Sequence, residues 1–181
     1  MPEIMFDLSD IDPNPWQPRE SDDPEHIKKI ADSIAADGLM QTPVGRRVDG
    51  RVQLAFGHSR LAAYKLLASQ GYTNQMPVNV RDLNDEEMFR LAISENIARK
   101  DLSPLEEAQA MERYRSEFGK TSVEIGQLFG LSDSAVRNKL RLLNLPEDAQ
   151  AALKTGVMTE GAGRALLPYY ALPTETRILW D

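Results

Sequence analysis

The stretch that decides the fold is Ser94–Met111, SENIARKDLSPLEEAQAM. Glu95 and Asn96 stand side by side in it, and Arg99 follows shortly after. A carboxylate beside an amide can hold a metal ion, and a guanidinium can hold a phosphate. Pro104 then marks the first turn of a second helix, where proline is favoured. The stretch therefore predicts a hinge between two helices, with a candidate nucleotide site at the end of the first.

This stretch resembles the second sequence box of the ParB family of chromosome and plasmid partition proteins, ENxxRxDLxPxEEA. The matching residues are Glu95, Asn96, Arg99, Asp101, Leu102, Pro104, Glu106, Glu107 and Ala108. The resemblance implies an α+β protein with two domains. We expect residues 1–100 to form a small mixed-sheet, ParB/sulfiredoxin-like nucleotide-binding domain, and residues 101–181 to form an all-α helix-turn-helix domain that binds DNA.

Composition is that of an ordinary soluble protein, with 41% hydrophobic and 27% charged residues in a chain of 181. No apolar run approaches the roughly 18 to 20 residues that span a bilayer, and the acidic N-terminus is unlike a signal peptide. The absence of cysteine excludes disulfides and thiolate metal sites. We expect a cytoplasmic protein without a membrane partner, associated with a nucleoid or plasmid.

The net charge of −7 at first argues against binding to nucleic acid, which normally requires clustered Lys and Arg. Residues 1–37 account for this excess, with three Lys or Arg against ten Asp or Glu. Residues 45–66 instead hold five basic residues against Asp49 alone. The charge distribution therefore predicts that an anion binds in the second region.

The first domain shows clear local signals after a start in which alternation is weak. Asp23-Pro24-Glu25 predicts a helix that ends at Gly38, and Asp49-Gly50 predicts the turn of a β-hairpin. We expect another helix to begin after Gly57, a strand over residues 76–83, and a helix from Asn84 to the Glu95-Asn96 pair.

Gly57-His58-Ser59-Arg60 has the composition of a phosphate site. Glycine lets the backbone approach a phosphate, a helix start offers N–H groups, and arginine adds a fork of donors. The ParB family has GERRxRA here, a box that contacts nucleotide phosphates. His58 and Ser59 replace its Glu and first Arg, which leaves hydrolysis open. Gln17 and Arg19 match a QPR segment that lies against the nucleotide in the family.

A helix-turn-helix pattern lies between Thr121 and Leu143. A capping box opens a helix through Phe129, Gly130-Leu131-Ser132 forms a tight turn, and a second helix follows from Asp133. In this motif the second helix enters the major groove. The candidate DNA-binding residues are Ser132, Ser134, Arg137, Asn138 and Arg141. Further short helices are predicted over 148–154 and 159–167, the latter ended by Pro168.

The resemblance implies a concrete function. ParB proteins bind a centromere-like DNA site, bind CTP with Mg²⁺ at the N-terminal domain, and close as a clamp that slides on DNA. The implied nucleotide-binding residues are Gln17, Arg19, Gly57, His58, Ser59, Arg60, Glu95, Asn96 and Arg99, with Glu95 and Asn96 also holding the metal. The implied partners are double-stranded DNA, a second copy through the N-terminal domains, and a ParA-type ATPase. We expect the family's C-terminal dimerisation domain to be absent.

Three alternatives remain open. The first is a DNA-binding segregation or transcription adaptor that has lost nucleotide binding or hydrolysis, which His58 and Ser59 favour. The second is an enzyme that transfers phosphate, as in sulfiredoxin-like and serine-kinase-like relatives, although no acid near Gly57 is placed as a general base. The third is a nuclease, which needs several clustered metal-binding acids. CTP hydrolysis by the clamp itself also stays open, and the two enzyme alternatives rank last.

Overall fold

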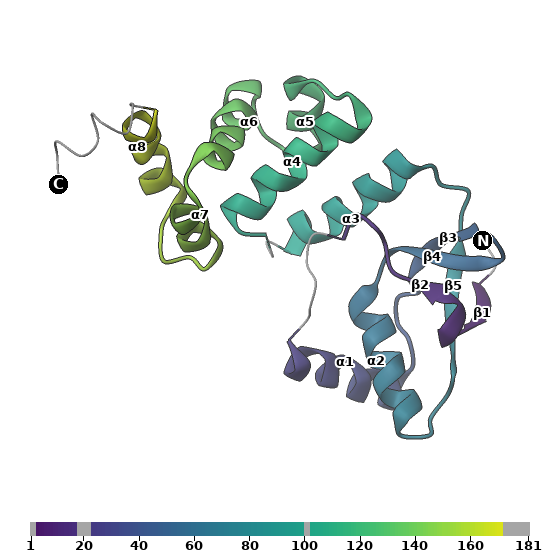
Figure 1. Ribbon diagram of the computed structural model, residues 1–181. Coiled ribbons are helices and arrows are strands. Elements are labelled where there is room, and N and C mark those ends of the chain that lie inside the picture. Colours follow the sequence, from purple (N-terminus) through teal and green to yellow (C-terminus); the bar gives the residue numbers. More distant parts are fainter. Residues whose placement is uncertain (1–2, 18–22, 100–101, 172–181) are drawn as a thin grey trace. The chain divides into compact units, whose positions relative to one another are not determined.

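The structure is a computed structural model that describes residues 3–17, 23–99 and 102–171 (Figure 1). The side chain of Arg99 is outside this description. Contacts between Cα atoms divide the chain into two compact units, residues 1–95 and 96–181. None of the helices in the described part is long and apolar enough to cross a membrane.

The N-terminal unit is built on a five-stranded mixed sheet. Its strands are β1 (Glu3–Asp7), β2 (Ile11–Asp12), β3 (Val44–Val48), β4 (Arg51–Phe56) and β5 (Gln75–Val80). The order across the sheet is β1-β5-β3-β4-β2. β1 pairs with β5 and β3 with β4 antiparallel, whereas β3 pairs with β5 and β2 with β4 parallel. The expected mixed sheet is confirmed, and β1 is a strand that the weak alternation did not predict.

Helices cover both faces of this sheet. α1 (Pro24–Asp37) and α2 (His58–Ser69) lie side by side, and α3 is Asp85–Arg99 (Figure 1). Leu54 of β4 belongs to the core formed with α1 and α2, while its neighbour Ala55 packs with Met88 of α3. Successive residues of a strand point to opposite faces, so β4 contributes to both layers.

Local sequence signals fix the turns around the sheet. Asp23 caps α1, since its side chain accepts a hydrogen bond from the N–H of Glu25 at 3.1 Å. Asp49 and Gly50 have φ angles of 50° and 83°, as a two-residue hairpin turn requires. Gly57 precedes α2 with φ 99°, and a Cβ there would lie 2.9 Å from Cβ of Pro43. Glycine is therefore required at this position for two separate reasons.

The C-terminal unit is helical in its described part. It contains α4 (Pro104–Phe118), α5 (Ser122–Phe129), α6 (Asp133–Leu140), a 3₁₀ turn η2 (Arg141–Asn144), α7 (Glu147–Lys154) and α8 (Glu160–Tyr170). Complete capping boxes at Ser103 and Thr121 begin α4 and α5. α5 and α6 form the predicted helix-turn-helix, and a Cβ on Gly126 would lie 2.4 Å from the carbonyl oxygen of Leu131 in the turn.

Three predicted boundaries in the helices are wrong. α3 does not end at the Glu95-Asn96 pair but continues to Arg99. The second helix of the motif ends at Leu140, because an unbroken helix would place Leu142 about 160° away from Leu140. The tighter turn of η2 instead buries Leu142 completely. α8 continues past Pro168 to Tyr170, since a proline in the last turn costs few helical hydrogen bonds.

Candidate functional site

The start of α2 is open to an anion. Gly57 provides no side-chain cap, and the first turn contains no acidic residue. The unpaired N–H groups of a helix start and the positive end of its dipole both favour a negative ligand. The four predicted residues Gly57, His58, Ser59 and Arg60 lie together here, with Ser59 buried and Arg60 half-buried.

Arg60 lies at the edge of a hollow of about 360 Å³ in the N-terminal unit. Its Nη2 donates a hydrogen bond to Oε1 of Gln41 at 2.7 Å. The hollow is also lined by His26, Lys29 and Met40, so several basic groups surround it. Gln41 was not predicted as a site residue, because it carries no signal in the sequence apart from its position before β3.

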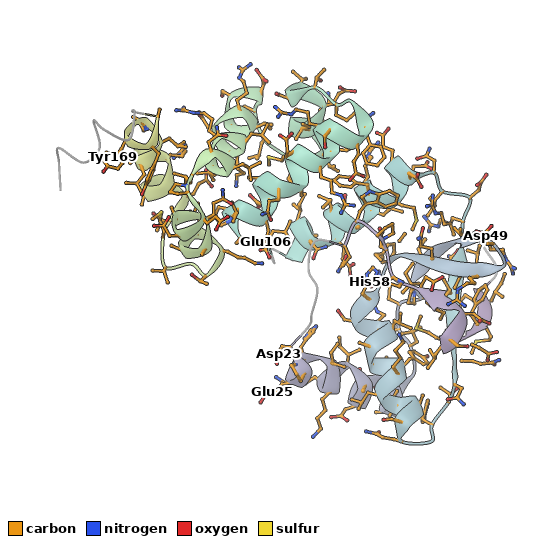
Figure 2. All side chains as sticks on the ribbon, in the orientation of Figure 1. Asp23, Glu25, Asp49, His58, Glu106 and Tyr169 are labelled. Carbon is orange, nitrogen blue, oxygen red and sulfur yellow. The ribbon has the colours of Figure 1, made fainter. Side chains whose placement is uncertain are left out.

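Asn14 ties the loop that follows β2 to the start of α2. Its backbone N–H donates to Nε2 of His58 at 2.9 Å, and His58 is labelled in Figure 2. Its Nδ2 donates to the carbonyl oxygens of Ala55 at 2.9 Å and Met88 at 3.2 Å. Asn14 is 3% exposed. Asn14 was not predicted either, although an asparagine before a proline in a turn-rich loop is a weak signal.

Gln17 is held in the same loop, where its backbone N–H donates to the carbonyl oxygen of Asn14 at 3.1 Å. Its Oε1 is buried and has no hydrogen-bond partner among the described residues. A buried acceptor of this kind is a candidate contact for a ligand donor. Arg19 lies outside the described residues, as does the side chain of Arg99.

Glu95 and Asn96 are neighbours inside α3, with Asn96 only 5% exposed and Glu95 half-buried. They lie about 10 Å further along the helix axis than Met88, which contacts Asn14. Consecutive helical residues point about 100° apart, so the pair alone offers poor metal coordination. Within the described part of the chain, no three His, Cys, Asp or Glu residues cluster as a metal site. A metal held here would need oxygens from its ligand.

The predicted DNA-binding residues share one face of the second unit. At 100° per residue, Ser134, Arg137, Asn138 and Arg141 fall within an arc of about 100°. Val136 and Leu140 lie outside this arc and are buried. We call this outward surface, formed by those four residues, the reading face. Ser132 lies just before α6 and caps this helix, because its Oγ accepts a hydrogen bond from the N–H of Ala135 at 3.2 Å.

A groove of about 560 Å³ lies beside the reading face and is lined by Arg115, Arg137, Arg141 and Asn144, among others. Arg137 pairs with Asp133 at 2.5 Å, and Arg115 pairs with Glu112 at 2.5 Å. Exposed pairs of this kind contribute little, so a phosphate can replace the carboxylates. Arg141 forms no ion pair with any other residue that the structure describes. Arg115, on α4, was not predicted.

Comparisons with known proteins agree with this arrangement. The ParB N-terminal domain model matches residues 3–97, and the ParB HTH domain model matches residues 100–178. Chromosome-partitioning protein Spo0J of Thermus thermophilus is 40% identical over 91% of the chain, and stage 0 sporulation protein J of Bacillus subtilis is 34% identical over 88%. The chain spans 59% and 55% of these relatives.

A solved structure extends the likeness to three dimensions. The crystal structure of C-terminally truncated chromosome-partitioning protein ParB from Caulobacter crescentus, complexed to the centromeric parS site, matches with a TM-score of 0.67. The two sequences are 29% identical, and the match covers 97% of each chain. The two family models, one on each unit, cover nearly the whole sequence. The chain therefore belongs to the ParB family.

Proposed function

We propose that this protein segregates DNA by binding a specific centromere-like site through α5 and α6. The observation that carries the proposal is the reading face, where Ser134, Arg137 and Asn138 project from α6, the second helix of a helix-turn-helix. Arg141 projects from the turn η2 that directly follows it. Arginine recognises guanine, asparagine recognises adenine, and serine contacts bases or phosphates. The fold match to a ParB protein complexed with parS supports the same assignment.

The groove beside the reading face extends the proposed DNA interface. Arg115 and Asn144 flank Arg137 and Arg141 there, so phosphates can be held next to the bases that are recognised. The segment 121–145 carries only three basic residues against two acidic ones. Affinity per copy should therefore be modest, and self-association through the N-terminal domains would raise it.

The proposed DNA binding can be tested by fluorescence anisotropy with two duplexes, one that contains the parS site and one of scrambled sequence. We expect the wild type to prefer parS, and we expect Asn138→Ala and Arg141→Gln each to weaken parS binding about 5- to 100-fold. Lys154→Gln is the control, because Lys154 is exposed on α7 away from the reading face. Equal binding of both duplexes by the wild type would refute site-specific recognition.

We further propose that the N-terminal unit binds CTP and that CTP gates a sliding clamp. The phosphates would lie at the start of α2 against Gly57, Ser59 and Arg60, with the nucleoside in the adjoining hollow. Gln17 offers its buried acceptor to the same ligand. Arg19 and Arg99 are assigned to the phosphates by the family resemblance alone. The choice of cytosine comes from that resemblance as well.

Mg²⁺ is assigned to Glu95 and Asn96, completed by phosphate oxygens, as Mg²⁺ sites commonly are. The nucleotide domain would comprise residues 1–100 and the DNA-binding domain residues 101–181. A ParA-type ATPase is the partner that the family resemblance implies. These assignments form one hypothesis, since a metal at Glu95 and Asn96 depends on a triphosphate being bound.

Calorimetric titration of CTP in the presence of Mg²⁺ tests the nucleotide site, with ATP, GTP and UTP as controls. We expect saturable binding of CTP alone, lost in Arg60→Ala and in Asn96→Ala. Arg47→Ala is the matched control, because Arg47 is an exposed arginine of β3 outside the hollow. Release of phosphate from bound CTP would then show whether the protein is also a CTPase.

A DNA-binding adaptor without a nucleotide is the second candidate, and the position of His58 favours it. Nε2 of His58 is occupied by the N–H of Asn14, so this nitrogen cannot donate to a phosphate. Ser59 is buried and also replaces a charged residue of the family box. If no nucleotide binds, with or without DNA, while parS binding persists, the adaptor is the better assignment.

A further inference from the structure

One basic residue of α6 lies away from its reading face. Lys139 points about 150° from the middle of the arc formed by Ser134, Arg137, Asn138 and Arg141. Its side chain is only 11% exposed. A lysine on a DNA-recognition helix would ordinarily be assigned to a phosphate because of its charge. Its position in the structure indicates a different role.

The ammonium group of Lys139 lies between two other helices of the same unit. Nζ contacts a carboxylate oxygen of Glu107 on α4 and lies 3.2 Å from Oε2 of Glu160 on α8. Burial lowers the pKa of Lys139, but the hydrogen bonds and charges of the two glutamates outweigh this effect and hold the pKa above its ordinary value. Lys139 therefore stays charged and joins α6 to α4 and α8.

Lys139 offsets the repulsion between the carboxylates of Glu107 and Glu160, because its ammonium group pairs with both. Removing Lys139 would leave the carboxylates of Glu107 and Glu160 close together with no shared cation, since Arg164, at 4.0 Å, pairs with Glu160 alone. Partly buried ion pairs often add little net stability, since desolvation offsets the attraction. Their directional contacts can nevertheless fix how one helix is placed against another.

We propose that Lys139 is a positioning residue that orients the reading face by holding α6 between Glu107 and Glu160, and that it does not contact DNA. This inference rests on the proposed binding of DNA through α6. Base contacts require placement within about 0.5 Å, whereas phosphate attraction tolerates small shifts. Loss of the lysine should therefore reduce discrimination between DNA sequences more than it reduces general affinity.

The test compares the wild-type chain with Lys139→Met on parS and scrambled duplexes over a series of salt concentrations. We expect parS binding to weaken about tenfold, as for one lost base contact, while scrambled binding changes less than about twofold. The slope of log affinity against log salt should stay unchanged, because no phosphate contact is lost. Arg115→Gln provides the contrast, because Arg115 lines the groove assigned to phosphates and its loss should reduce the slope by about 0.9.

A second variant separates positioning from stability. Glu107→Gln combined with Lys139→Met removes the ion pair without leaving an extra buried charge at Glu107. We expect this double variant to regain most of the thermal midpoint lost in Lys139→Met but not the discrimination. Lys154→Met serves as the control for removal of an exposed lysine.

Three outcomes would overturn the inference. They are a salt slope reduced by about 0.9 in Lys139→Met, equal weakening on both duplexes, or wild-type discrimination in the double variant. A wild type without preference for parS would instead refute the proposed function.

Discussion

The backbone N–H of Asn14 lies 2.9 Å from Nε2 of His58 and donates a hydrogen bond to it. An imidazole nitrogen accepts only when it carries no proton, so the proton of neutral His58 is on Nδ1. The contact connects the loop after β2 to the first residue of α2. The residue that departs from the family's phosphate box therefore holds the neighbouring loop in place.

Replacing His58 should show how much this hydrogen bond contributes to the free energy of unfolding. His58→Phe keeps a flat ring but removes the acceptor, which leaves a part-buried N–H of Asn14 unpaired. We expect the free energy of unfolding to fall by about 1–3 kcal/mol. Urea denaturation measured by the fluorescence of Trp16, in a Trp180→Phe background, provides the readout. His58→Gln retains an acceptor and should lose less than about 1 kcal/mol; equal stability of His58→Phe and wild type would contradict the prediction.

Replacing Arg46 should reduce stability far more than replacing its neighbour Arg47. Its guanidinium donates to Oε1 of Gln53 and to the carbonyl oxygen of Leu83, pairs with Asp85 at 2.6 Å, and lies 5.9 Å from the ring centroid of Trp16. Lysine cannot reproduce this fork and stacking. We expect Arg46→Lys to reduce the free energy of unfolding by about 1–2 kcal/mol and to alter Trp16 emission.

The control for that experiment is Arg47→Lys. Arg47 is exposed in the same strand, and its guanidinium lies 5.4 Å from the ring centroid of Phe6. Its replacement should change stability by less than about 0.5 kcal/mol. A loss as large as that of Arg46→Lys would show that the hydrogen bonds of Arg46 are not what matters.

Two glycines in helices should respond to alanine in opposite directions. In Gly126→Ala the new Cβ would lie 2.4 Å from the carbonyl oxygen of Leu131, so the turn of the helix-turn-helix must shift. We expect a loss of about 1–3 kcal/mol. Gly161 of α8 has open space, with Oγ1 of Thr159 at 4.0 Å, and Gly161→Ala should gain about 0.5–1 kcal/mol. Thermal unfolding by circular dichroism distinguishes these outcomes, and a stable Gly126→Ala would refute the close packing.

The capping box of α5 should make stability depend on pH. The backbone hydrogen bond from Thr121, followed by the bond from its side chain, holds the pKa of Glu124 below its ordinary value of 4.5. A lowered folded-state pKa means that the stabilisation is complete above the unfolded-state pKa and is lost as pH falls through the folded-state value.

Glu124→Gln should therefore have a lower thermal midpoint than wild type at neutral pH. The difference should shrink as pH falls below about 4.5 and vanish once the carboxylate is protonated in both states. Thermal midpoints measured across this range check the prediction. A difference that persists unchanged in acid would show that the charge of Glu124 is not responsible.

The parts of the fold that were predicted depend on short-range chemistry. Asp49-Gly50 formed the expected turn and Thr121 with Glu124 the expected capping box, because each needs only neighbouring residues. The mixed sheet and the helix-turn-helix followed from such signals together with the family boxes. β1 was missed because it is stabilised by pairing with β5, its neighbour in the sheet, whose residues are far away in the sequence.

The contacts within the candidate sites were less predictable. Asn14 with His58, Gln41 with Arg60, and Lys139 with Glu107 join residues far apart in the sequence. A sequence pattern shows which groups are present but not which distant partner each will meet. The break between α6 and η2 has the same cause, since the burial of Leu142 outweighs the local preference for a longer helix.

The length of α6 limits how much sequence one copy can distinguish. Eight residues make a helix about 12 Å long, which extends over only three or four base pairs at 3.4 Å each. A sequence of three or four base pairs recurs by chance about once in every 60 to 250 base pairs, whereas a genome offers about a million or more competing sites. If the protein recognises a unique site, as proposed, the DNA sequence of that site must therefore contain at least two half-sites, each bound by a separate copy of the protein.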